Sequence, residues 1–270
     1  MTGPEVTGDP AEIKACCAAA YARDAVALLL GESYHPGGLT LTRRLADLLG
    51  LRPGQRVVDV ASGPGATARL LAAEYGVSVD GVEFGEASVE RARAAAAEAG
   101  LSARVRFHQG DAERLPLPDA FADAVACECA LCTFPGKDAA AAEFARVLRP
   151  GGRVGITDVT VAGAGLPEEL TTMAAWVACI AGARPAQEYA AILGAAGLRV
   201  ILTEAHDDAL ARMVGQIEAR VRLLRMTAAD QLAAAGVDAG TVLRYAALAG
   251  RAVADGLIGY RLLVAEKPLA

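Results

Sequence analysis

Short apolar runs alternate with helix-like segments along the first 160 residues of the chain. Five of these runs have the length and composition of buried strands, at residues 56–60, 77–82, 104–108, 121–127 and 153–159. The segments between them, such as 66–75 and 139–148, are rich in alanine and leucine and predict helices. Strands and helices that alternate in this way indicate an α/β fold built around a mainly parallel sheet.

Helical patterns flank this alternating region on both sides. Residues 11–30 are expected to form one helix, and leucines at helical spacing between residues 41 and 49 predict another that ends at Gly50. Beyond residue 160, helices are expected at 166–182, 185–196 and 208–256, the last with a break near 236–240. Trp176, in the first of these, is expected in the apolar interior of a lid. Strands at 199–205 and 260–266 bring the expected total to seven.

The first expected strand ends in a glycine-rich turn, with the sequence V-V-D-V-A-S-G-P-G from Val57 to Gly65. A strand, a tight turn and a helix in this order present free backbone N–H groups to a ligand. In open α/β sheets such a turn lies at the carboxyl ends of the strands, where ligands bind. The turn alone is a weak signal, because many such turns need glycine only for their backbone conformation.

Acidic residues at the ends of three successive strands make that signal stronger. Asp59 precedes the turn, Glu83 follows the second strand, and Asp111 follows the third. A carboxylate at the second of these positions suits ribose hydroxyls, and one at the third suits an adenine amino group. No G-K-S/T triplet is present, so the turn is not a P-loop. Several acids favour a ligand that has no phosphate and carries a positive sulfonium.

These motifs make the chain resemble the class I S-adenosylmethionine-dependent methyltransferases between about residues 39 and 160. The resemblance rests on the glycine-rich turn, on V-E-F at 82–84, on G-D-A-E-R-L-P-L-P-D at 110–119 and on V-L-R-P-G-G at 147–152. Ala61 departs from the usual first glycine, and we expect it to start the turn with a negative φ. The resemblance implies a Rossmann-like seven-stranded methyltransferase sheet with helical lid additions, and S-adenosylmethionine as the methyl donor.

The same resemblance implies which residues and segments serve the donor. Its expected contacts are Asp59, Ala61, Gly63, Gly65, Glu83, Phe84, Asp111, Ala112 and Glu128, with Tyr34 and His35 near the methionine end. Three parts are expected in the chain: an N-terminal helical lid segment (1–38), the S-adenosylmethionine-binding core (39–160), and the rest of the sheet with helical lid insertions (161–270).

Composition is that of an ordinary enzyme of one domain. The chain has 270 residues and a net charge of −6, which argues against a nucleic-acid partner because such proteins need a basic surface. The longest uncharged apolar stretch, residues 170–183, is shorter than the roughly 20 residues of a membrane-spanning helix. The N-terminal residues lack the features of a signal peptide. We therefore expect a cytoplasmic protein whose cysteines are mostly reduced.

Six cysteines offer a choice of chemistries. Cys127, Cys129 and Cys132 form C-x-C-x-x-C at the end of the fourth strand, and Cys127 and Cys129 would share a side if extended. One interpretation is that the cysteines are small buried hydrophobes. A second is a structural zinc site, which needs a fourth ligand. A third is that thiolates bind a soft substrate.

The cysteine-containing segments resemble those of the arsenite methyltransferases. The similar segments are Ala15-Cys16-Cys17, Cys127-Glu128-Cys129 with Phe134-Pro135-Gly136-Lys137, and Cys179-Ile180-Ala181-Gly182-Ala183. The resemblance implies that Cys129 and Cys179 hold trivalent arsenic, that Cys16 or Cys17 closes over it, and that a thiol reductant takes part. The chain departs from that family at Leu30-Gly31-Glu32-Ser33, which lacks the usual cysteine, so the third ligand is not identified.

Three functions are therefore considered for the chain. Trivalent arsenic keeps a lone pair that attacks a sulfonium methyl group without a general base, so positioning and exclusion of water would suffice. The alternative enzyme methylates O, N or C of a small natural product, for which His206 is the candidate base. The non-enzymatic alternative is a donor-binding or zinc-sensing protein.

Overall fold

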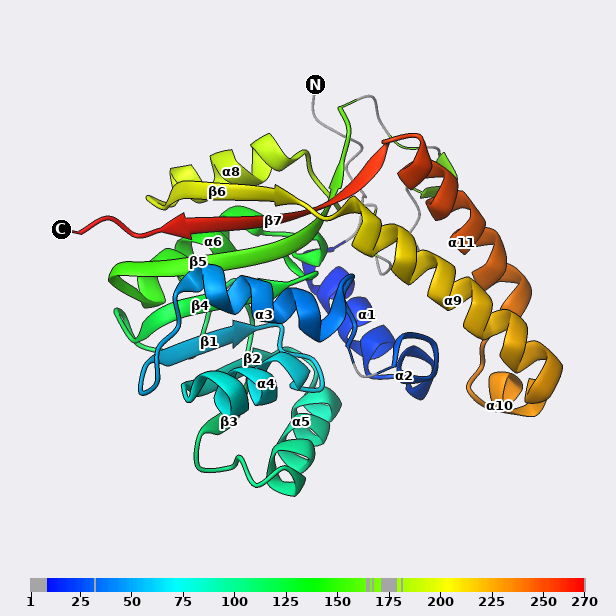
Figure 1. Ribbon diagram of the computed structural model, residues 1–270, viewed down its shortest axis with the longest axis horizontal. Helices are drawn as coiled ribbons and strands as arrows, with labels where there is room; N and C mark the ends of the chain where they lie inside the picture. The colour runs from blue at the N-terminus through cyan, green and yellow to red at the C-terminus, as the bar shows by residue number, and fades with distance from the viewer. Residues whose placement is uncertain are drawn as a thin grey trace.

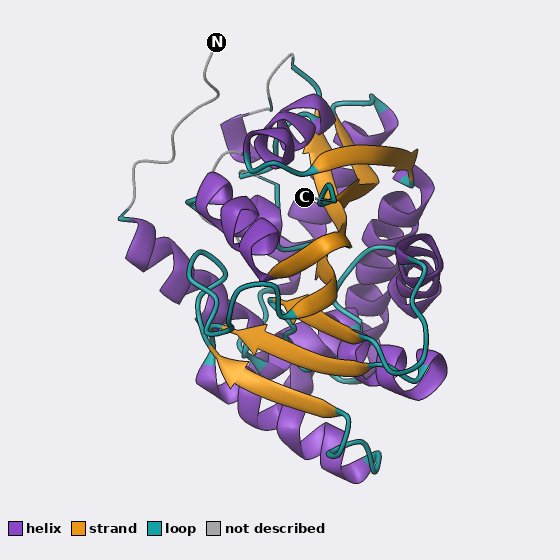
Figure 2. Cartoon of the chain, turned by 90° about the vertical axis from the view of Figure 1, so that its left-hand side faces the viewer, coloured by secondary structure: helices purple, strands orange, loops and turns teal. Residues whose placement is uncertain are grey.

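Seven strands form one twisted sheet at the centre of the molecule (Figures 1 and 2). The computed structural model describes residues 9–31, 33–163, 166, 168–170, 179–180 and 182–269. The strands are β1 (Arg56–Val60), β2 (Ser78–Glu83), β3 (Val105–Gln109), β4 (Ala122–Glu128), β5 (Leu148–Val161), β6 (Arg199–Ala205) and β7 (Ile258–Glu266). Their order across the sheet is β3-β2-β1-β4-β5-β7-β6, and only β7 runs antiparallel to its neighbours.

This arrangement confirms the predicted Rossmann-like methyltransferase sheet, with all seven strands close to their expected positions. The largest difference is β5, which begins at Leu148 instead of residue 153. The P-G-G segment at 150–152, directly after the helix expected at 139–148, belongs to this strand. Backbone hydrogen bonds explain this extension: Gly151 N donates to Lys267 O and Lys267 N donates to Gly152 O, at 2.8 and 2.9 Å.

Helices cover both faces of the sheet (Figure 2). One face packs against α3 (Gly38–Leu49), α4 (Ala66–Tyr75) and α5 (Glu86–Glu98), with Leu45 and Leu71 buried in the interface. The other face packs against α6 (Lys137–Val147) and α8 (Ala186–Ala195), with Phe144 and Tyr189 buried. Because β1 is buried on both sides, its residues after Arg56 are apolar except for Asp59.

The N-terminal segment forms two helices where the sequence predicted one. They are α1 (Pro10–Tyr21) and α2 (Asp24–Leu30). Arg23 between them has an extended backbone, with φ −77° and ψ 142°. The Arg91 guanidinium donates to the carbonyl of Ala22, so an external donor satisfies this group at the break. Asp9 caps the start of α1 by accepting from Ala11 N at 3.1 Å.

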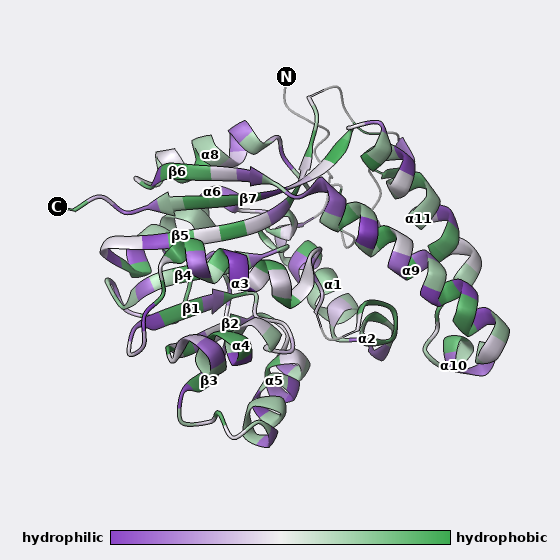
Figure 3. Cartoon of the chain, viewed as in Figure 1, coloured by the Kyte–Doolittle hydropathy of each residue, from purple (hydrophilic) through white to green (hydrophobic). Residues whose placement is uncertain are grey.

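A helical arm leaves the sheet after β6. It consists of α9 (Asp207–Thr227), α10 (Ala229–Ala234) and α11 (Ala239–Ala254), with α9 and α11 side by side and α10 at the far end (Figure 1). The expected break near residues 236–240 is confirmed, and Ala228 adds a second one. Apolar and polar residues alternate along both long helices, as Figure 3 shows, which fits their pairing along one face.

The predicted helix at 166–182 lies mostly outside the described residues, as does Trp176. Within that range, Glu168–Leu170 form a short 3₁₀ helix and Cys179 lies in a turn. The other predicted helix, 185–196, is confirmed as α8. None of the helices in the described ranges is long and apolar enough to cross a membrane.

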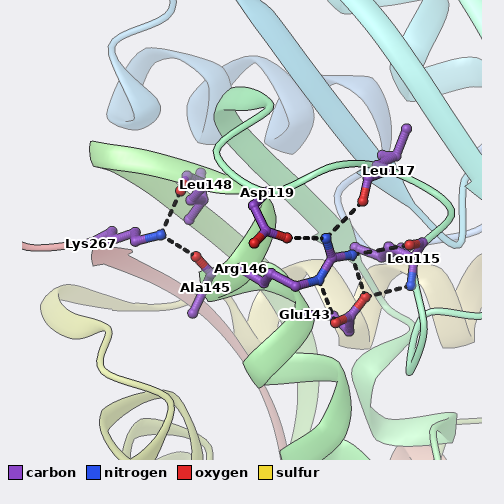
Figure 4. A network of polar contacts seen from close by, with 8 residues as sticks. All are labelled: Leu115, Leu117, Asp119, Glu143, Ala145, Arg146, Leu148 and Lys267. Carbon is purple, nitrogen blue, oxygen red and sulfur yellow. Dashed lines mark hydrogen bonds and ion pairs between the residues drawn. The ribbon is translucent and has the colours of Figure 1, made fainter.

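A polar network around Arg146 on α6 fixes the loop that follows β3 (Figure 4). Its guanidinium donates to the carbonyls of Leu117 and Leu115, at 2.8 and 3.1 Å, and to the carboxylates of Asp119 and Glu143. Glu143 in turn accepts from Leu115 N at 2.7 Å. The loop carries Asp111 and Ala112 at its start, so this network anchors one wall of the pocket described next.

Candidate active site

A pocket opens where β1, β2, β3 and β4 reach their carboxyl ends. Of the predicted donor contacts, ten line it: Tyr34, His35, Asp59, Ala61, Gly63, Glu83, Phe84, Asp111, Ala112 and Glu128. Gly65 is not among the lining residues, although it shapes the turn. Parallel pairing explains the convergence, because Val60 aligns with Val82 and with Cys127 on the two adjacent strands.

The glycine-rich turn has a left-handed backbone at three positions. Gly63 and Gly65 have φ of 50° and 77°, and a side chain on Gly65 would collide with the ring of Phe107. Ala61 also has a positive φ, of 55°. The expectation of a negative φ there was wrong, and the alanine holds a conformation that glycine adopts more easily.

Three buried carboxylates define the electrostatics of the pocket. Asp59 is 2% exposed, and its Oδ2 has no hydrogen-bond partner among the described residues. Burial raises the pKa of Asp59 well above its usual range, and the nearby Glu128 carboxylate adds to the increase. A buried carboxylate oxygen without a partner is costly, so this pocket is suited to a positively charged ligand.

Glu83 lies at the end of β2 and holds the turn. Its Oε2 accepts from Gly63 N at 3.0 Å and its Oε1 accepts from Gly85 N at 2.8 Å. Burial raises the pKa of Glu83, although these backbone hydrogen bonds work in the opposite direction. Its carboxylate therefore organises the turn and also faces the pocket.

Glu128, at the end of β4, is held by two threonines that the sequence analysis did not select. Thr67 Oγ1 donates to its Oε2 at 2.6 Å, and Thr42 Oγ1 donates to the same oxygen at 3.0 Å. His35 Nε2 lies 3.5 Å from Glu128 Oε2, while His35 Nδ1 faces the carbonyl of Pro36 at 3.3 Å. The predicted residues Glu128 and His35 thus form one buried cluster.

Lys14 is a second residue that the sequence analysis missed. Its Nζ lies 2.7 Å from Asp111 Oδ2 and 2.5 Å from Glu113 Oε2, so α1 is joined to the end of β3. Burial alone would lower the pKa of Lys14, but the hydrogen bonds to both carboxylates raise it above its ordinary value. The spacing of Lys14, Cys17 and Tyr21, all lining the pocket, places them along one face of α1 and was the available signal.

Cysteines from three segments meet beside this pocket. Cys179 Sγ lies 3.2 Å from Tyr21 Oη, and in the thiol form it donates to the carbonyl of Cys129 at 3.3 Å. Hydrogen bonds from the Cys129 and Cys132 thiols lower the pKa of Cys179 well below its usual range, and Tyr21 contributes in the same direction. The neighbouring thiols and the Tyr21 hydroxyl thus favour the thiolate form of Cys179 over that of Cys129 or Cys132. Cys129 and Cys179 both have left-handed backbones, with φ of 52° and 63°.

The remaining cysteines have different surroundings. Burial raises the pKa of Cys17 to about 12, and nearby Cys179 adds to the increase. Cys16 is exposed. Cys127 and Cys129 were expected to share a side only if the backbone stayed extended, and it does not: β4 ends at Glu128, and the left-handed backbone at Cys129 turns its side chain to the other face of the sheet. Among the described residues, no group of three or more histidine, cysteine or acidic side chains is arranged to hold a metal ion.

Comparisons with known proteins identify the family of the chain. Residues 57–152 match the methyltransferase domain family. The chain is 33% identical over 230 residues to 27-O-demethylrifamycin SV methyltransferase of Amycolatopsis mediterranei, covering 84% of this chain and 83% of that protein. It is 38% identical over 119 residues to nocamycin O-methyltransferase of Saccharothrix syringae, covering 43% of this chain and 42% of that protein.

Among solved structures, the fold is similar to Haemonchus contortus phosphoethanolamine N-methyltransferase 2 in complex with S-adenosyl-L-methionine. The TM-score is 0.79 at 20% sequence identity, covering 98% of this chain and 58% of that one. The chain belongs to the S-adenosylmethionine-dependent methyltransferase family. It is a methyltransferase with S-adenosylmethionine as its donor, and the acidic pocket with its unpaired Asp59 oxygen fits that cation.

Proposed function

We propose that this enzyme methylates a hydroxyl group of a small natural product. The observation that carries the proposal is a second cavity, of about 580 Å³, that shares Ser33 and His35 with the donor pocket. This volume is in the range of small-molecule sites. One relative, which covers 84% of the chain, is named 27-O-demethylrifamycin SV methyltransferase. Another is named nocamycin O-methyltransferase.

His206 is the residue we propose as general base. It lines the second cavity, directly after β6, and its Nε2 lies 3.3 Å from Glu204 Oε2. With the hydrogen on Nε2 donated to Glu204, Nδ1 is left to accept the proton of the substrate hydroxyl. His35 is less suited to this role, because both of its ring nitrogens already face oxygen atoms of the protein.

The donor supplies an electrophilic methyl group when bound. We propose that Asp59, Glu83 and Glu128 provide the negative charge that its sulfonium and amino groups need, with Glu83 also accepting from the ribose hydroxyls. Ala61, Gly63 and Gly65 form the turn beneath it, and Phe84, Asp111 and Ala112 border its adenine. Tyr34 and His35 border the methionine end. The protein then orients the two substrates and excludes water.

We also propose that residues 1–38 and the helices inserted after residue 160 act as a lid over the core at 39–160. Four α1 residues line the donor pocket: Lys14, Cys17, Ala18 and Tyr21. Tyr21 also contacts Cys179, from the segment that follows β5. A lid must contact the edge of the sheet at which the donor binds, and here two distant parts of the chain do so.

The cysteine group supports a second candidate, methylation of trivalent arsenic with a thiol reductant. Cys129 and Cys17 line the donor pocket, and Cys179 adjoins both. Thiolates prefer such soft ions. Cys129, Cys179 and Cys17 would be the ligands, but their side chains would have to move together, since they are not arranged as a metal site in the structure, and Cys129 and Cys17 would have to release their protons. The exposed Cys16 is less suited.

One experiment separates the two candidates. Purified enzyme and donor are incubated with 27-O-demethylrifamycin SV and other hydroxylated macrocycles and phenols, or with arsenite and glutathione, and products are identified by mass spectrometry. For O-methylation we expect a methylated hydroxyl compound. His206→Ala should then lower kcat on the order of 10²-fold or more, the usual contribution of a general base. Cys129→Ser and Cys179→Ser should have mild effects, and Asp208→Asn, next on α9, is the control for His206.

Methylation of arsenite that is lost in Cys129→Ser and Cys179→Ser, and kept in His206→Ala and the control Cys16→Ser, would establish the second candidate. The first proposal is wrong if arsenite is the only acceptor turned over, or if His206→Ala leaves O-methylation unchanged.

A further inference from the structure

The two adjoining cavities have opposite charge. The donor pocket is lined by four carboxylates: Asp59, Glu83, Asp111 and Glu128. The second cavity is lined by two arginines, Arg44 and Arg212, and none of its described lining residues is acidic, although Glu204 pairs with Arg44 and His206 from that lining. The whole chain has 32 acidic and 26 basic residues, so a cavity lining without acidic residues differs from the overall composition. This separation of charge matches a cationic donor on one side with an anion on the other.

Arg212 is the cation most available in the second cavity. Among the described residues, none forms a hydrogen bond or ion pair with its guanidinium. Arg44, by contrast, donates to Glu204 through Nε at 3.2 Å and through Nη2, so its charge is already balanced. The nearby Asp207 is bonded to Arg261 and to Tyr260 N, and Asp208 is exposed. Arg212 is itself exposed and lies one helical turn after Asp208, but neither acid forms an ion pair with it among the described residues, so its charge is available to a ligand.

The first turn of α3 adds to this positive potential. Gly37, Gly38, Leu39 and Thr40 line the cavity, and Gly37 at the N-cap has no side chain to cap the helix. The first turn also contains no acidic residue. The N-terminal backbone N–H groups of a helix carry partial positive charge and bind oxyanions when no side chain satisfies them.

The rest of the cavity wall is apolar, with Leu30, Leu39, Leu41, Ala209 and Met213 among its residues. From these surroundings we infer that the acceptor is an amphipathic acid, with a carboxylate or phosphate held by Arg212 and an apolar body in the cavity. This inference rests on the proposed function in taking the cavity as the acceptor site. It assigns Arg212 as a specificity-determining residue.

Binding of simple probes tests the inference without turnover. The full-length enzyme is saturated with S-adenosylhomocysteine, which fills the donor pocket, and is titrated with octanoate, octyl phosphate or 1-octanol by calorimetry. We expect at least one of the two anions to bind more tightly than the alcohol. Arg212→Gln should weaken the binding of that anion about tenfold, the effect of losing one hydrogen bond to a charged group. Arg225→Gln, an exposed arginine further along α9, is the matched control.

The comparison of octanoate with octyl phosphate identifies the acidic group. The inference is overturned if 1-octanol binds as tightly as both anions, or if Arg212→Gln and Arg225→Gln have equal effects. Because no methyl transfer is measured, an Arg212-dependent anion site would stand even if no hydroxyl compound were methylated. Conversely, suppose that O-methylation depends on His206 but not on an acidic group in the acceptor. The proposed function would then stand, and this inference would be rejected.

Discussion

Lys14 on α1 and Asp111 at the end of β3 are joined by a hydrogen-bonded ion pair, with Nζ 2.7 Å from Oδ2. The second oxygen of Asp111 accepts from Glu113 N at 2.9 Å, so both carboxylate oxygens have partners within the protein. The N-terminal helix is therefore fastened at the edge of the pocket where the adenine is proposed to lie. At the other end of α1, Tyr21 contacts Cys179.

The first prediction is that Lys14 retains the donor by holding α1 closed. Replacing it in Lys14→Met keeps the apolar stem and removes the ammonium. We expect the dissociation rate of S-adenosylhomocysteine to increase about 3- to 10-fold, the range for a partly buried charged hydrogen bond. Stopped-flow displacement measures this rate. Lys14→Arg keeps the positive charge, so its dissociation rate should be close to that of the wild type. An unchanged rate in Lys14→Met would mean that α1 does not gate the pocket.

The second prediction concerns hydrogen exchange in the N-terminal segment. Because α1 lines the donor pocket, amides within residues 11–38 should exchange more slowly when S-adenosylhomocysteine is bound. Mass spectrometry of proteolytic fragments measures this. Helix α11, whose residues do not line the pocket, is the internal control and should be unaffected. Equal exchange of residues 11–38 with and without ligand contradicts the lid assignment.

The third prediction tests Glu83 as a donor contact. Glu83→Ala removes a carboxylate that faces the pocket and also holds Gly63 N and Gly85 N. We expect donor binding to weaken by about 1.5–3 kcal/mol, as for hydrogen bonds to a charged group. Calorimetry measures the affinity, and the melting temperature separates a local effect from misfolding. Glu98→Ala, at an exposed position on α5, should bind the donor with wild-type affinity. Equal affinities for both variants would contradict the assignment of Glu83 as a donor contact.

A fourth prediction follows from Asp158 on β5, which is buried next to the cysteine group. Burial raises the pKa of Asp158 from 3.8 to about 7, and Cys179 adds to the increase. Between these values the folded protein keeps a proton that the unfolded chain has lost, so stability falls as pH rises through this window. Asp158→Asn should reduce the loss of unfolding free energy between about pH 5 and about pH 8.

Urea unfolding at several pH values measures this dependence. Asn cannot replace both acceptors, because Asp158 accepts from Cys132 N and Val159 N at 2.9 and 2.7 Å. A lower overall stability is therefore expected, and the slope with pH is the informative quantity. Asp208→Asn, at an exposed position, should retain the wild-type slope. A slope in Asp158→Asn that equals the wild-type slope would show that another group titrates.

The sequence alone determined the sheet and the donor end of the site. Strand β6 was predicted at its observed bounds, and the acids at the ends of β1, β2 and β3 converge because parallel strands bring their carboxyl ends to one edge. These features depend on local patterns, namely apolar runs, glycine turns and short spacings, which a linear sequence records directly. The same patterns were sufficient to indicate the methyltransferase family.

Only the tertiary structure decided which distant residues meet. Lys14 lies 97 positions from Asp111, and Tyr21 lies 158 positions from Cys179, so no local pattern pairs them. The backbone of Ala61, and the turn that separates Cys127 from Cys129, also depend on how the strands end against their neighbours. The contrast between the acidic donor pocket and the second cavity arises because the fold brings α3 and α9, which are distant in the sequence, to the lining of one cavity.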